Sequence, residues 1–125
     1  MSVELPQMSI PALKADASLT DHVLTTRLNG TADIECKPTL DNFVKSLHKA
    51  AMQDKVRKVV VDLRELEFMN SSSFKVFVSW LGVVQELPAD QQYRIHFLSN
   101  PNIHWQRRSL AALSCFAVDL VSIET

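Results

Sequence analysis

The sequence predicts a single α/β domain, with a mostly parallel central sheet of about five strands and helices packed against it. Segments of strand character alternate along the chain with single segments of helical period, as in strand–helix–strand units. Val59, Val60 and Val61 form an unbroken apolar run, which favours a strand covered on both faces. The 125 residues suffice for one core, so we expect one domain with an edge segment at 1–20 and a core at 21–125.

The first half of the chain predicts two strands and one helix. Within residues 1–20, apolar and polar side chains alternate around prolines, which suits a short edge strand. Residues 22–28 are rich in β-branched types, and we expect a strand that ends at the turn signal Asn29 and Gly30. Residues 38–53 predict a helix because they carry one apolar stripe at helical spacing: Leu40, Phe43, Val44, Leu47, Ala50 and Ala51.

The second half continues the alternation. A strand is expected over 57–63, followed by a helix over 72–87 that ends before a proline. Residues 92–98 alternate strictly between apolar and polar types, which predicts another strand. A helix over 103–113 and a last strand over 117–123 complete the order.

Composition excludes several classes of protein. The net charge is −1, from 13 basic against 14 acidic residues, so no overall field attracts nucleic acid or anionic lipid. Two glycines, Gly30 and Gly82, are too few for a Walker loop, a dinucleotide-binding fingerprint or a nucleophile elbow. No apolar run approaches the roughly 18 residues that span a bilayer. We therefore expect a soluble, cytoplasmic protein without nucleic-acid partners or membrane insertion.

The chain offers no set of residues for catalysis or metal binding. The two cysteines, Cys36 and Cys115, lie far apart and are expected to be inert small side chains. None of the four histidines has helical spacing to another or a cysteine at ligand spacing. We expect no enzyme activity, no metal and no cofactor.

The most informative stretch is residues 59–74. We expect the buried strand to end near Leu63 and a short loop to carry Phe68 and Met69. Asn70 and three consecutive serines then open a helix. Polar side chains at this position accept hydrogen bonds from the free N–H groups of the first turn. One cap needs only one such residue, so simple capping and a functional serine site both remain open.

This stretch resembles the signature of the STAS domain, the fold of bacterial anti-sigma-factor antagonists. That signature is an apolar strand ending in Asp-Leu, a loop with Phe and an apolar residue, and Asp-Ser-Ser-Gly at the start of a helix. Residues 59–63, 68–69 and 70–73 correspond to these three parts in order. The resemblance covers about residues 20–125 and includes the loop from Gly30 to Asp33. The closing helix also fits, at Arg108, Leu110 and Leu113.

The resemblance implies a regulatory module that binds a partner kinase, anti-sigma factor or related regulator. The first serine of the motif is often phosphorylated by that partner, and the phosphate releases it. This position is Ser71, with Ser72 as the next candidate. The loop residue Asp33 matches a family position near the site, although it also reads as an ordinary turn carboxylate. Two motif positions differ, because Asn70 replaces Asp and Ser73 replaces Gly.

The helix after the serines is apolar almost all round. We expect burial for Phe74, Phe77, Val78 and Leu81. Three further residues, Val76, Trp80 and Val83, could instead form an exposed partner-binding patch beside the serines, since tryptophan is enriched at binding hot spots. The alternative for these three residues is that they too belong to the core.

A second function fits the same resemblance. STAS-like domains also serve as constitutive accessory subunits of lipid or anion transport systems, often without the phosphoserine. The substitutions at Asn70 and Ser73 raise this alternative. An enzyme ranks third because no nucleophile and base are paired in the sequence.

Overall fold

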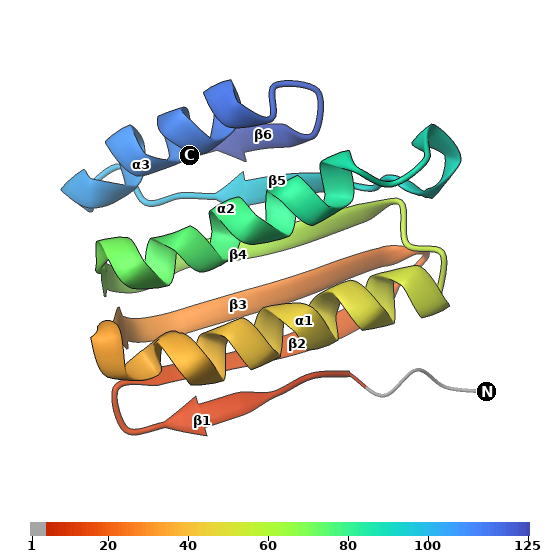
Figure 1. The fold of residues 1–125 in the computed structure, drawn as a ribbon. Coiled ribbons are helices and arrows are strands. Elements are labelled where there is room, and N and C mark those ends of the chain that lie inside the picture. The colour runs from red at the N-terminus through yellow and green to blue at the C-terminus, as the bar shows by residue number, and fades with distance from the viewer. Residues whose placement is uncertain (1–4) are drawn as a thin grey trace.

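The computed structural model describes residues 5–125, which form a six-stranded sheet and three α-helices (Figure 1). The expected N-terminal edge segment contains two strands rather than one, so the sheet has one strand more than predicted. In chain order the elements are β1 (Met8–Ile10), β2 (Leu13–Thr20), β3 (Val23–Ala32), the 3-10 helix η1 (Ile34–Cys36), α1 (Lys37–Gln53), β4 (Lys58–Met69), α2 (Ser71–Gln85), the 3-10 helix η2 (Ala89–Gln91), β5 (Arg94–Leu98), α3 (His104–Phe116) and β6 (Val121–Glu124).

The strands lie in the sheet in the same order as in the chain. β1, β2 and β3 form an antiparallel meander. From β3 onward each strand pairs in parallel with the next, and one α-helix crosses over between successive strands. The predicted α/β class with a mostly parallel sheet is therefore confirmed.

All three helices cover the same face of the sheet (Figure 1). Val59 and Val61 of β4 are fully buried beneath them, whereas Val60 points the other way and is only half-buried. The expectation that both faces of this strand are covered is wrong. An apolar run alone does not distinguish a strand covered by helices on both faces from one covered on a single face. On the open face, neighbouring side chains partly cover Val60.

The open face carries a polar network in place of a second helix layer. Asp62 is 4% exposed and accepts hydrogen bonds from the Arg64 side chain at 2.8 and 3.0 Å. Arg27 Nε lies 3.4 Å from the same carboxylate. The Arg64 hydrogen bonds hold the pKa of Asp62 below its usual value despite burial. The buried carboxylate is therefore ionised and paired with arginine side chains, so the open face of the sheet is polar.

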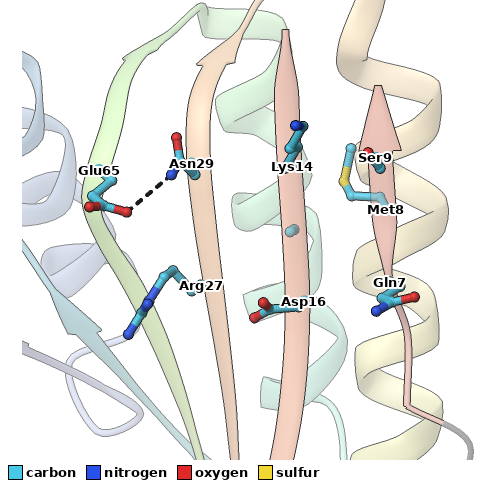
Figure 2. A pocket seen from close by; sticks show the side chains of 9 residues that line it. Gln7, Met8, Ser9, Lys14, Asp16, Arg27, Asn29 and Glu65 are labelled. Carbon is cyan, nitrogen blue, oxygen red and sulfur yellow. Dashed lines mark hydrogen bonds between the residues drawn. The ribbon is translucent and has the colours of Figure 1, made fainter. Parts of the chain in front are cut away.

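A shallow hollow of about 550 Å³ lies beside this network, over β1 to β4 (Figure 2). Its polar side chains include Lys14, Asp16 and Arg27, and Asn29 Nδ2 donates to Glu65 Oε2 at 3.1 Å. Positive and negative groups alternate across the strands. This pattern is that of a solvated sheet face with cross-strand pairs.

β3 does not end at Asn29 and Gly30 as predicted, but continues to Ala32. Gly30 has φ +118° and lies at an irregularity in the pairing with β4. A Cβ at this position would lie 2.2 Å from the carbonyl oxygen of Ala12, which accepts a hydrogen bond from Thr31 N at 2.8 Å. The glycine therefore permits a bulge and a close strand contact rather than a turn.

β4 likewise continues to Met69, so the loop expected after Leu63 is strand. β5 pairs only with residues 58–62 of β4. Beyond that point, Gln106 of α3 takes the place of a neighbouring strand. Its Nε2 donates to the carbonyl oxygens of Leu63 at 2.5 Å and Leu66 at 3.0 Å, and its side chain is fully buried.

The helix layer is braced by a buried hydrogen-bond chain. Trp80 Nε1 of α2 donates to the hydroxyl oxygen of Tyr93 at 2.7 Å, and His48 Nδ1 of α1 lies 2.6 Å from that oxygen. An indole N–H can only donate, so the tyrosine proton is free to be donated to His48.

Across residues 5–125, the helices are too short or too polar to cross a membrane.

Candidate functional site at the start of α2

The three serines and Asp33 meet at one edge of the sheet. β3 and β4 are parallel and remain paired up to Ala32 and Met69, so both end at this edge. The backbone N–H of Asn70 donates to the carbonyl oxygen of Ala32 at 2.9 Å. This contact fixes the two loops side by side before α1 and α2 begin.

Asn70 is the N-cap of α2. Its backbone is extended, and its Oδ1 accepts a hydrogen bond from Ser73 N at 2.8 Å. An amide oxygen serves this purpose as well as the carboxylate of the family motif does, because either accepts from the free N–H groups of the first turn. The replacement of Asp by Asn therefore preserves the start of the helix and removes one negative charge.

The three hydroxyl groups differ in accessibility. Ser71 is exposed and Ser72 is half-buried. Ser73 is fully buried, and its Oγ donates to the carbonyl oxygen of Asp33 at 2.9 Å. Only Ser71 presents its side chain freely, and Ser73 is the least suited of the three to accept a phosphate.

The side chain of Asp33 is engaged in its own turn. Its Oδ1 accepts from Glu35 N at 3.0 Å and thereby caps the 3-10 helix η1. Cys36 Sγ lies 3.4 Å from the same oxygen, and burial raises the pKa of this thiol. The carboxylate thus has the geometry of a turn residue, while the Asp33 carbonyl ties the loop to Ser73.

Two exposed apolar side chains border the serines. Ile34, directly after Asp33, is 67% exposed, and Phe68, two residues before Asn70, is 48% exposed. Neither residue is predicted as a site residue from the sequence, although Phe68 belongs to the motif. The available signal is an apolar residue in each of two segments that lie outside the predicted strands and helices.

The predicted exposed patch on α2 is wrong for two of its three residues. Val76 and Trp80 are 4% and 3% exposed, because this side of α2 packs against α1. Only Val83 is accessible, at 49%, and it lies near the opposite end of the helix from the serines. Conversely, Phe74 and Val78, which were expected to be buried, are half-buried at the border of the core.

The site presents hydroxyl, amide and apolar groups rather than a reactive set. Within the described part of the chain, no group of three His, Cys, Asp or Glu side chains is arranged to hold a metal. The site offers one exposed hydroxyl group, on Ser71, and the exposed apolar side chains of Ile34 and Phe68.

Comparison with known proteins shows a similar fold in distant sequences. An anti-sigma factor antagonist from Mycobacterium paratuberculosis superposes with a TM-score of 0.63 at 17% identity, over 86% of each chain. The protein TM1081 gives 0.59 at 19% identity, over 86% of this chain and 78% of its own. The antagonist SpoIIAA, in its unphosphorylated form, gives 0.54 at 17% identity, over 98% and 89%.

The chain has the STAS-like fold of the anti-sigma factor antagonists, as the motif at residues 59–73 predicts. No protein-family model matches the sequence, and a search of curated proteins by sequence finds no match. The likeness lies in the fold, so the function has to be argued from the site.

Proposed function

We propose that this chain is a regulatory protein-interaction module of the anti-sigma-factor-antagonist kind. Its partner is a kinase, an anti-sigma factor or a related regulator, and phosphorylation of Ser71 switches the binding. The observation that carries this proposal is the accessibility of Ser71, the first motif serine, beside a buried Ser73. The module acts in the cytoplasm, by binding rather than by catalysis.

A phosphate on Ser71 is compatible with the fold. The first turn of α2 contains no acidic residue, so no neighbouring charge in that turn repels the phosphate. The amino end of a helix carries a partial positive charge, which stabilises an anion there by about 1 kcal/mol. A phosphate brings a charge of about −1.5 to −2. Modification should therefore change the surface and leave the domain folded.

The same phosphate would oppose partner binding. A partner that covers the exposed side chains of Ile34 and Phe68 also has to approach Ser71. Removing a phosphate from water costs several kcal/mol, which is more than an exposed ion pair across one helical turn returns. The unmodified form is then the binding form, and the modified form releases the partner.

A pull-down from native lysate tests this proposal. Wild type, Ser71→Ala and Ser71→Asp serve as baits, with Ser46→Asp as the matched control because Ser46 is an exposed serine of the neighbouring helix α1. We expect wild type, Ser71→Ala and Ser46→Asp to hold the same partner and Ser71→Asp to lose it. Mass spectrometry of the bait should place phosphate on Ser71, or secondarily on Ser72.

A different result would favour the second function. If all four baits hold one partner and the serines are unmodified, the switch is absent. The chain would then be a constitutive accessory subunit, of the kind associated with lipid or anion transport.

A further inference from the structure

Positive charge borders the serines in a groove between the starts of α1 and α2. The groove encloses about 550 Å³ and is lined by Lys37, Pro38, Asp41, Lys75, Val76 and Ser79. Its only carboxylate, on Asp41, already pairs with Lys45 at 3.0 Å. Among the ion pairs within residues 5–125, none involves Lys37 or Lys75. The groove therefore keeps unpaired cationic side chains.

Lys75 lies four residues after Ser71 in α2, and both side chains are exposed. Residues at this spacing are neighbours on one face of a helix. An anion that precedes the cation in the chain is also the more favourable order. The nearby carboxylate of Asp33 is occupied by hydrogen bonding within its own turn, and its carbonyl rather than its side chain faces α2.

We propose that Lys75 is the intramolecular partner of a phosphate on Ser71. Pairing across one helical turn holds the phosphate on the surface of α2. It also withdraws the Lys75 charge from the groove, so modification alters two neighbouring parts of the surface at once. This assignment rests on Ser71 being the modified residue under the proposed function, and it concerns what the phosphate does once present.

Phosphorus NMR of the full 125-residue chain, with phosphoserine incorporated at position 71 during synthesis, tests the pairing. The second ionisation of the phosphate is followed as a function of pH in wild type, Lys75→Gln and the control Lys49→Gln. Lys49 is an exposed lysine on α1 that does not line the groove. A cation one turn away stabilises the dianion, so we expect Lys75→Gln to raise the phosphate's proton affinity about twofold. Lys49→Gln should leave it unchanged.

Identical titrations of wild type and Lys75→Gln would overturn the proposal, as would an equal shift in the Lys49→Gln control. Lys75 is exposed, so circular dichroism should show both variants folded. Because the phosphoserine is introduced during synthesis, the result does not depend on a cellular kinase. Absence of phosphate on Ser71 in cells would instead refute the proposed function and leave this titration unaffected.

Discussion

Removing the Tyr93 hydroxyl should destabilise the domain by about 2 kcal/mol, because the buried N–H of Trp80 then has no hydrogen-bond acceptor. Tyr93 and Trp80 are 2% and 3% exposed, and the Trp80 N–H donates to the Tyr93 oxygen at 2.7 Å. In Tyr93→Phe this N–H has no acceptor and no access to water. A buried unsatisfied polar group costs about 1–3 kcal/mol, whereas half-buried His48 can turn to solvent.

Urea unfolding followed by far-UV circular dichroism measures this loss, and the thermal midpoint should fall by about 8 °C for a domain of this size. The decisive comparison repeats the substitution in a Trp80→Phe background, which has no indole N–H that could lose its acceptor. There the cost of Tyr93→Phe should drop below about 1 kcal/mol. An equal loss in the free energy of unfolding in the two backgrounds would refute the explanation that the unpaired Trp80 N–H causes it.

Three further substitutions test other parts of the fold. Gly30→Ala places a methyl group 2.2 Å from the Ala12 carbonyl oxygen at positive φ, and should lower the free energy of unfolding in urea by about 2 kcal/mol or more. Gln106→Leu removes the donors to two β4 carbonyls, and we expect a loss of about 2 kcal/mol by the same assay. Burial lowers the pKa of His48 below 6.5, so below that pH the unfolded chain binds more protons and stability falls as pH drops towards the folded-state pKa. His48→Gln should flatten this pH dependence between pH 7 and 5, and an unchanged slope would assign it to another group.

Sequence periodicity predicts elements well where one local pattern decides them. The helix expected over 38–53 is found as α1, Lys37–Gln53, and its six predicted apolar positions are all buried. The strand ends are less well predicted. Gly30 is a turn signal when the sequence is considered alone, but in the fold it lies against the Ala12 carbonyl, in the turn between β1 and β2, where a Cβ would not fit. That contact joins residues far apart in the chain.

The same limit explains the errors at the site. α2 is apolar on nearly every side, so its sequence does not reveal that Trp80 is buried against Tyr93. Nor does the serine run reveal which hydroxyl is free. Ser73 is occupied by the carbonyl of Asp33, 40 residues earlier, and this contact leaves Ser71 as the accessible one. The motif predicts where the site lies, and the tertiary contacts determine which of its serines is exposed.

The most direct test of the account is the affinity of the captured partner for the chain phosphorylated at Ser71. Isothermal titration calorimetry would compare the unmodified chain, the chain carrying phosphoserine at position 71, and a control carrying phosphoserine at position 46 on α1. We predict binding at least about tenfold weaker for the position-71 form, equivalent to 1.4 kcal/mol, and unchanged binding for the position-46 form. Equal affinity of all three forms would contradict the switch at its central point.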